Sequence, residues 1–242
     1  MPAQIFNVSI PRSGHHYLAT LLHAALKGDM DYCWRADSSC CKTAPCTIRR
    51  TRFLLRKTHD SKLDLPRAEQ VTYVIQHRDP ETQVESYANH QRARLRQRNE
   101  MFPIDDLDWG LRWITSHAYY FVEFHRKWIR EPPVNAVIVA YEELKSRPEK
   151  VVESILDAAG YEIARSEIEA VVAENQHLMP ARLTGPGTRN RYVPHDPVRS
   201  RALPVGWAEE FKKLVESVLA HQEPRGTFAK AYHQHLSQRL SS

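Results

Sequence analysis

The sequence predicts an α/β protein, built as a three-layer sandwich in which helices flank a central, mostly parallel sheet. Two observations support this fold class. Short, almost uninterrupted apolar runs alternate with longer segments of helical spacing, which is typical of a parallel sheet covered on both faces. Hydrophobic residues make up 42% and charged residues 26% of the 242 positions, a composition that can enclose one large core.

The first element is a strand at 5–10, which Pro11 ends. Beyond Gly14 the apolar residues recur at helical spacing, so a loop and a helix follow. Apolar, β-rich runs predict further strands at 52–57, 70–76 and 135–141. Helical spacing predicts the other helices at 80–98, 107–130, 147–159, 164–174 and 206–221. The segment 176–204, rich in Pro, Gly and Arg, is expected to be an irregular loop that covers a ligand.

We expect one domain over 1–242, with a cysteine-rich insert at about 31–50. All the cysteines lie in this insert: Cys33, Cys40, Cys41 and Cys46. Adjacent cysteines rarely bridge each other, so a disulfide would link Cys40 and Cys41 to the other two. The paired knuckles of a zinc site are absent from the sequence. Thiols, disulfides and a metal site stay open as alternatives, and a cytosolic location favours thiols.

The net charge of +5 predicts an anionic partner. The Arg-dense stretch 92–98 is interleaved with Gln and Asn rather than aromatic residues, which argues against nucleic acid as that partner. No apolar window approaches the roughly 18 residues of a membrane span, and the chain enters its first strand without a leader pattern. We therefore expect a cytoplasmic protein.

The segment Pro11-Arg12-Ser13-Gly14-His15-His16-Tyr17-Leu18 stands where the first strand meets the first helix. Backbone N–H groups and the helix dipole favour an anion at such a turn. Arg12 adds a positive charge, and Ser13, His15 and His16 can donate hydrogen bonds to phosphate oxygens. A Walker A loop would need another glycine and a Lys-Ser/Thr pair, so an ordinary NTPase is disfavoured.

Arg78-Asp79-Pro80 follows the third predicted strand, and Ser86 lies about two helical turns further on. A cation at the carboxyl edge of the sheet and a nearby hydroxyl can bind a second phosphate. A surface Arg–Asp pair before a proline-initiated helix is the alternative interpretation.

Lys57-Thr58-His59-Asp60 ends the second predicted strand, at the edge where open α/β sheets bind their ligands. An extended backbone puts Lys57 and His59 on one side. In this arrangement Lys57 can neutralise a leaving group and His59 can act as general base. A purely structural histidine is the alternative.

Together these motifs resemble those of the sulfotransferases that depend on 3′-phosphoadenosine-5′-phosphosulfate (PAPS). PRSGHHYL is similar to the 5′-phosphosulfate loop of that family, and HRDPETQVESY is similar to its 3′-phosphate motif. KTHD resembles the Lys-Thr-His segment of the cytosolic enzymes. AYEELKSRPEKVVESILDAAG resembles a Tyr-Glu-Asp-Leu…Pro segment that follows a later strand. The four motifs stand in family order.

The resemblance implies a P-loop NTPase-like fold and transfer of a sulfuryl group from PAPS, with 3′-phosphoadenosine 5′-phosphate (PAP) as product and no metal. It implies in-line transfer to a hydroxyl, or an amine, of a small-molecule or glycan acceptor. His59 would be the general base, with Asp60 as the alternative, and Lys57 and Arg12 would stabilise the leaving phosphate. The residues expected to bind the cofactor are Arg12, Ser13, Gly14, His15, His16, Arg78 and Ser86, with Arg189 or Arg191 closing the site.

The sequence departs from the family pattern in its two histidines, His15 and His16, which replace the usual hydroxyl residues. The late Arg-Lys-Gly motif is also not literal, and Arg189 and Arg191 are its nearest substitutes. A P-loop-like small-molecule kinase and a non-enzymatic anion-binding module are the competing hypotheses. A kinase would require Mg²⁺ and ATP. Four aromatic residues could meet the acceptor, although their spacing is more typical of a core: Trp109, Trp113, Tyr119 and Tyr120.

Overall fold

The computed structural model describes residues 3–27, 29–34, 43, 45–46, 53–104, 106–175 and 203–221. The chain divides into two compact units. The first unit comprises Met1–Arg78 and Glu131–Asn190, and the second comprises Asp79–Arg130 and Arg191–Ser242. The single domain expected from the sequence stays a prediction.

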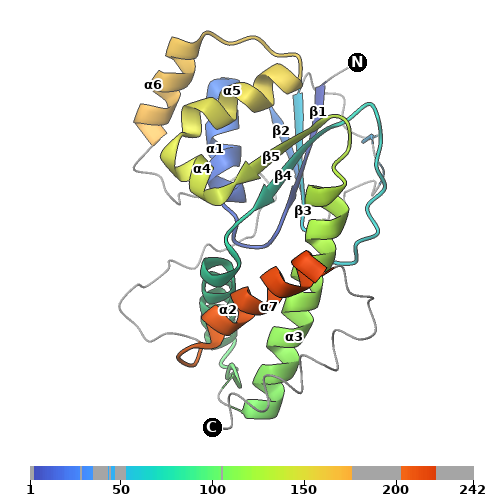
Figure 1. The fold of residues 1–242 in the computed structure, drawn as a ribbon. Helices are drawn as coiled ribbons and strands as arrows, with labels where there is room; N and C mark the ends of the chain where they lie inside the picture. The colour runs from blue at the N-terminus through green and yellow to red at the C-terminus, as the bar shows by residue number, and fades with distance from the viewer. Residues whose placement is uncertain are drawn as a thin grey trace. The chain divides into compact units, whose positions relative to one another are not determined.

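The first unit is built on a five-stranded, entirely parallel sheet (Figure 1). Its strands are β1 (Ala3–Ser9), β2 (Asp31–Trp34), β3 (Phe53–Thr58), β4 (Thr72–His77) and β5 (Ala136–Ala140). They lie in the order β2-β3-β1-β4-β5. The predicted α/β class and parallel sheet are confirmed. Because β3 and β4 both pair with the central strand β1, the carboxyl ends of these three strands meet at one edge of the sheet.

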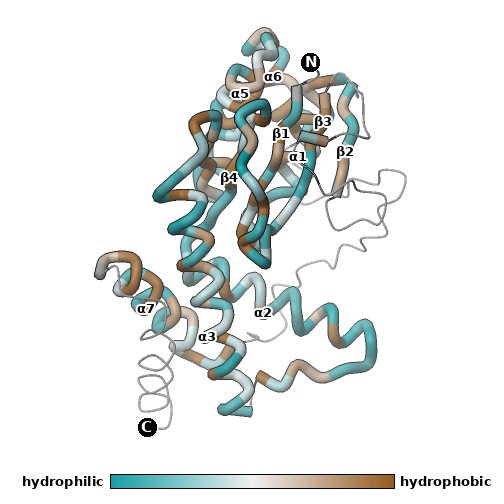
Figure 2. The backbone as a smooth tube through the Cα atoms, turned by 90° about the vertical axis from the view of Figure 1, so that its right-hand side faces the viewer, coloured by the Kyte–Doolittle hydropathy of each residue, from teal (hydrophilic) through white to brown (hydrophobic). Residues whose placement is uncertain are grey.

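Four of the helices in the described residues belong to this unit: α1 (His15–Ala25), α4 (Tyr141–Ser146), α5 (Pro148–Ala158) and α6 (Arg165–Asn175). Their buried apolar side chains form one core with alternate strand residues, among them Ile5, Leu55, Val74 and Val139. Figure 2 shows apolar residues along the central strands of this unit. The helices thereby fix β1 and the turn that leads into α1.

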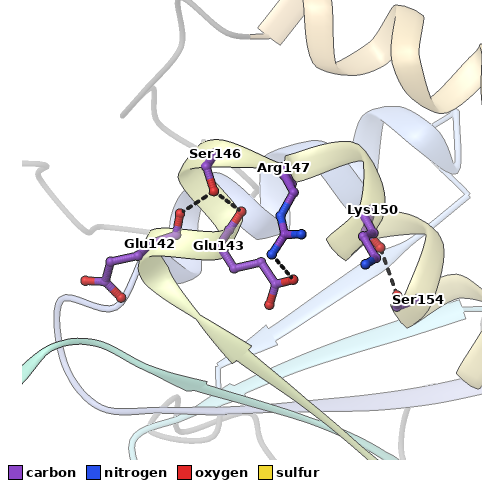
Figure 3. Close-up of polar contacts among 6 residues, drawn as sticks. All are labelled: Glu142, Glu143, Ser146, Arg147, Lys150 and Ser154. Carbon is purple, nitrogen blue, oxygen red and sulfur yellow. Dashed lines mark hydrogen bonds and ion pairs between the residues drawn. The ribbon is translucent and has the colours of Figure 1, made fainter.

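Local polar contacts shape the joint between α4 and α5 (Figure 3). Ser146 Oγ donates to the carbonyl of Glu142 at 2.9 Å, and Arg147 Nη2 donates to the Glu143 carboxylate at 3.2 Å. Pro148 disfavours a helical backbone at the residue before it, so α4 stops and α5 begins there.

The second unit contains α2 (Pro80–Arg96), α3 (Leu107–Phe124), the π-helical turn η1 (His125–Arg130) and α7 (Trp207–His221). The Asp79 carboxylate caps α2 by accepting from the Thr82 N–H at 3.1 Å, and Lys212 of α7 pairs with the same carboxylate at 3.0 Å. A Cβ on Gly110 would lie 2.6 Å from Trp207 Cη2, so glycine allows α7 to pack closely on α3.

The aromatic residues of α3 stack on one another within this unit. His117 is buried, and its ring lies 4.6 Å from that of Tyr87 and 5.7 Å from that of Trp113. Trp109 in turn stacks on Trp113. Trp109 and Trp113 are only half-buried and Tyr119 is 38% exposed, so these side chains pack together without forming a closed core.

The predicted elements are found within a few residues of their expected bounds, with three differences. β2 was not predicted, because it is a four-residue strand inside the cysteine-rich insert. α4 was not predicted because it follows β5 without a break. The helix expected at 107–130 changes to π-helical winding at His125.

Two of the clustered cysteines lie within the described residues. Cys33 and Cys46 are both buried and pack with Leu54. The Gln4 side chain accepts from the Cys46 N–H at 2.7 Å and donates to the Cys46 carbonyl at 3.2 Å. Cys40 and Cys41 lie outside the described residues, as does the predicted covering loop up to position 202.

Candidate active site

The turn between β1 and α1 requires glycine at its last position. Gly14 has a φ of 84°, a backbone conformation that other residues adopt only with strain. A Cβ there would lie 2.8 Å from Tyr141 Cδ2 and 3.1 Å from Leu144 Cδ2. Gly14 thus lets the turn pass close to α4. Arg12 also has a positive φ, of 71°, although it carries a side chain.

Ser13 is the most deeply buried residue of this turn. It is 1% exposed, and within the described residues its Oγ has no hydrogen-bond partner. A buried hydroxyl without a partner costs stability, about 1–3 kcal/mol in typical proteins. An anion held by the turn would supply that partner.

Arg78, directly after β4, lies against the same turn. Its Nη1 donates to the carbonyl of Arg12 at 3.3 Å, and its guanidinium carbon lies 4.3 Å from the centre of the Tyr141 ring. The hydrogen bond and the cation–π contact hold Arg78 at the carboxyl edge of the sheet.

Lys57 is buried at the same edge, near the end of β3, with 6% of its surface exposed. Burial, followed by the positive charge of Arg12, lowers the pKa of Lys57 to about 8. Both causes disfavour the charged ammonium. An anion bound near Lys57 and Arg12 would counteract both.

His59 follows β3 and is fixed by β1. Its Nδ1 lies 2.8 Å from the Ser9 carbonyl and 3.2 Å from Ser9 Oγ. A carbonyl can only accept, so Nδ1 carries the hydrogen and Nε2 of the neutral ring is the basic nitrogen. This is the tautomer that a general base at Nε2 needs.

Asp60 forms hydrogen bonds within the turn that follows His59. Its carboxylate Oδ1 accepts from the Leu65 N–H at 2.8 Å, and its own N–H donates to Thr58 Oγ1 at 3.0 Å. The φ of Asp60 is 44°. These contacts place the carboxylate in the turn between 60 and 65.

The ring of His15 faces the sheet. Its Nδ1 is hydrogen-bonded to Asn7 Oδ1, and its Nε2 lies 2.8 Å from the Tyr32 hydroxyl. Both ring nitrogens thus contact protein groups, while the main-chain N–H of His15 lies at the start of α1. The His16 ring stands edge-on to that of His15, 5.5 Å away.

Burial, the largest cause, holds the pKa of His15 well below its usual range, and the positive charge of Lys57 lowers that pKa further. His16 and His59 act on His15 in the same direction. Strand pairing brings the same groups together, because Lys57 lies opposite Asn7 of β1 and His59 contacts Ser9 at the end of β1.

Three residues of this region were missed by the sequence analysis: Asn7, Tyr32 and Gln76. Asn7 Nδ2 donates to Gln76 Oε1 at 2.7 Å, and Gln76 Nε2 donates to the Ser13 carbonyl at 3.1 Å. A signal was available for two of them, since Asn7 and Gln76 are amides inside apolar strands. Buried amides need partners, so such positions indicate a polar site below the surface.

Three predicted site residues remain: Ser86, Arg189 and Arg191. Ser86 is buried on α2, in the second unit. Arg189 and Arg191 lie outside the described residues. Across the described ranges, no group of three His, Cys, Asp or Glu side chains is arranged to hold a metal ion. Among the described helices, none is long and apolar enough to cross a membrane.

Comparisons with known proteins identify the family of the chain. The family model described as "Sulfotransferase domain" matches residues 2–177, most of the chain. The crystal structure of mouse sulfotransferase SULT7A1 complexed with PAP is similar in fold, with a TM-score of 0.55 and 15% identity over 96% of this chain and 88% of that one. A sulfotransferase from Alicyclobacillus acidocaldarius has a TM-score of 0.39 and 13% identity over 73% of this chain and 92% of that one. No curated protein matches the chain.

Proposed function

Because the chain belongs to the sulfotransferase domain family, we propose that it transfers a sulfuryl group from PAPS to a hydroxyl or an amine of a small-molecule or glycan acceptor. One observation supports this proposal above all. The buried Lys57 lies on the strand that pairs with β1, next to the turn into α1, and His59 is held by Ser9 of β1 in the tautomer of a base. We keep a cytoplasmic location as part of the proposal.

The residues of the turn fit the 5′ end of PAPS, which supplies the sulfuryl group. Ser13 offers a buried hydroxyl in need of a partner, and the start of α1 offers main-chain N–H groups. Arg12 and Lys57 supply the positive charge. The family resemblance assigns the 3′-phosphate to Arg78 and Ser86, and closure of the site to Arg189 or Arg191.

The proposed reaction breaks the bond between sulfur and the bridging oxygen of the leaving phosphate. Negative charge grows on that oxygen in the transition state, so Lys57, Arg12 and the amides of the turn stabilise it. Because these groups already supply positive charge at that oxygen, the proposed reaction does not require a metal ion. Burial and Arg12, which lower the pKa of Lys57, destabilise its ammonium form. Negative charge that develops on the leaving phosphate stabilises that ammonium form.

His59 accepts the proton of the acceptor hydroxyl at Nε2 as the new bond to sulfur forms. The Ser9 carbonyl, which accepts the Nδ1 hydrogen, orients the ring and stabilises the imidazolium that results. Asp60 is the alternative base, but its Oδ1 already accepts from the main chain.

The test is calorimetric titration of the protein with PAP in EDTA, in parallel with ATP with and without Mg²⁺. We expect metal-free binding of PAP with micromolar affinity, weakened at least about tenfold by Arg78→Ala, because a charge-assisted hydrogen bond is lost. Arg165→Ala is the matched control, since Arg165 is exposed on α6 and pairs with Glu169. Mg²⁺-dependent preference for ATP would support the kinase instead, and failure to bind PAP would overturn the proposal.

A further inference from the structure

Four polar side chains form one chain of hydrogen bonds across the first unit: Tyr32, His15, Asn7 and Gln76. We call them the positioning network. We propose that this network orients the peptide between Ser13 and Gly14, so that its N–H is presented to the bound anion. The inference rests on the proposed function for the identity of that anion.

The network joins three strands and a helix. Tyr32 lies on the edge strand β2, His15 begins α1, and Asn7 and Gln76 lie on β1 and β4. Asn7 and Gln76 are fully buried, with no exposed surface, and His15 is 5% exposed. The network ends on the Ser13 carbonyl at 3.1 Å. It thus links the outermost strand of the sheet to the turn that holds the anion.

The direction of every hydrogen bond follows from the last one. A carbonyl can only accept, so Gln76 must turn its NH₂ group to Ser13 and its oxygen to Asn7. Asn7 must then turn its own NH₂ group to Gln76 and its oxygen to His15.

The same reasoning fixes the ring of His15. Its Nδ1 must carry the hydrogen donated to Asn7, which leaves Nε2 to accept from the Tyr32 hydroxyl. Only neutral His15 can accept at Nε2. Burial, followed by the positive charge of Lys57, lowers the pKa of His15 and so favours the neutral form.

The end of the network determines the geometry of the turn. In a planar trans peptide the carbonyl of Ser13 and the N–H of Gly14 point in opposite directions. Because Gln76 holds that carbonyl from inside the sheet, the Gly14 N–H points away from Gln76. The four residues are therefore positioning residues, which act on the anion through the Ser13–Gly14 peptide.

Glycine-selective ¹⁵N labelling offers a direct test, because the chain has only eight glycines. The amide resonance of Gly14, assigned with Gly14→Ala, is followed during titration with PAP. Gln76→Met removes the donor to Ser13, and Tyr32→Phe removes only the hydroxyl at the far end. Gln83→Met is the matched control, since Gln83 is also buried and hydrogen-bonded to a buried histidine, His117, but belongs to the second unit.

We expect Gln76→Met to weaken PAP binding about tenfold and Tyr32→Phe about threefold, as for one hydrogen bond lost near to or far from the ligand. Both should shift the Gly14 amide of the ligand-free protein and reduce its response to PAP, while Gln83→Met should do neither. In Tyr32→Phe, ¹⁵N spectra of the imidazoles should also show a change at His15. Melting temperatures identify any variant that fails to fold. If Gln76→Met does not fold, the test of the network rests on Tyr32→Phe, which is the smallest change.

The network proposal is overturned if wild-type protein binds PAP and both variants keep its affinity and the Gly14 response. Failure of wild-type protein to bind PAP would count instead against the proposed donor. In that case inorganic pyrophosphate is the probe. A Gly14 response to pyrophosphate that both variants lose supports the network, and an equal response in all proteins overturns it.

Discussion

His59 is the residue on which the proposed proton transfer depends. We expect His59→Ala to lower kcat by on the order of 10²–10⁴, the usual contribution of a general base, and to leave the affinity for PAP within about threefold. The measurement is transfer of labelled sulfate from PAPS to an acceptor found by screening. His23→Ala, an exposed histidine on α1, is the control. Unchanged turnover in His59→Ala would remove His59 from the mechanism.

Lys57 should make anion binding depend on pH. With a pKa of about 8 in the ligand-free protein, Lys57 is charged below pH 8 and increasingly neutral above it. A bound anion favours the charged form, so affinity for PAP should fall as pH rises through about 8, by up to about tenfold per pH unit.

The same linkage predicts proton uptake on binding near pH 8, which calorimetry in buffers of different ionisation enthalpy measures. Lys57→Met should bind PAP more weakly at pH 7 and should lose this dependence. If the variant kept the slope of wild-type protein, another group would be responsible for it.

The residues at this site were not equally predictable. Lys57 and His59 follow from their position at the end of an apolar strand, because the sheet brings such ends together. His15 was expected to bind phosphate through its side chain, whereas its ring contacts Asn7 and Tyr32. Spacing along a helix does not reveal which side chains a neighbouring strand will meet, and β2, which supplies Tyr32, was itself not predicted.

At the scale of the element, the turn between β1 and α1 depends on Gly14. We expect Gly14→Ala to lower the free energy of unfolding by about 2–4 kcal/mol, combining strain at positive φ with crowding against Tyr141. Gly160→Ala is a matched control: its φ is +71°, but no atom lies within 4 Å of an added Cβ, so only strain of about 1 kcal/mol applies.

Urea denaturation gives both values. If both variants lost the same free energy of unfolding, the Tyr141 side chain would move aside without loss of stability. Contact with α4 would then not restrict the turn.

The predicted elements succeeded where burial imposes a clear pattern. β1, β3 and β4 are largely apolar because both faces of these inner strands are covered, whereas the edge strand β5 is apolar although only Val139 in it is buried. β2 begins with an aspartate and has four residues, too few for a pattern to emerge. The π-helical winding of η1 was also invisible, since it changes the backbone without interrupting the apolar spacing that continues from α3.

For the whole molecule, a single domain predicts one unfolding transition. Four of the five tryptophans lie in the second unit: Trp109, Trp113, Trp128 and Trp207. Tryptophan fluorescence therefore reports mainly on that unit, whereas far-UV circular dichroism reports on both.

We expect the two signals to give the same thermal midpoint, and PAP at 100 times its Kd to stabilise both by about 2.7 kcal/mol. Separate midpoints would indicate two domains that unfold independently.

The positioning network also has a consequence for the order of folding. Asn7 and Gln76 stand 69 positions apart in the chain, and their hydrogen bond can close only when β1 and β4 have paired. Tyr32 adds the requirement that β2 has docked on β3. Such distant contacts form late, because the chain loses entropy in closing long loops before it gains the contacts. During refolding, the ability to hold an anion should therefore emerge only after the sheet is assembled, so no partly folded chain would sequester the donor.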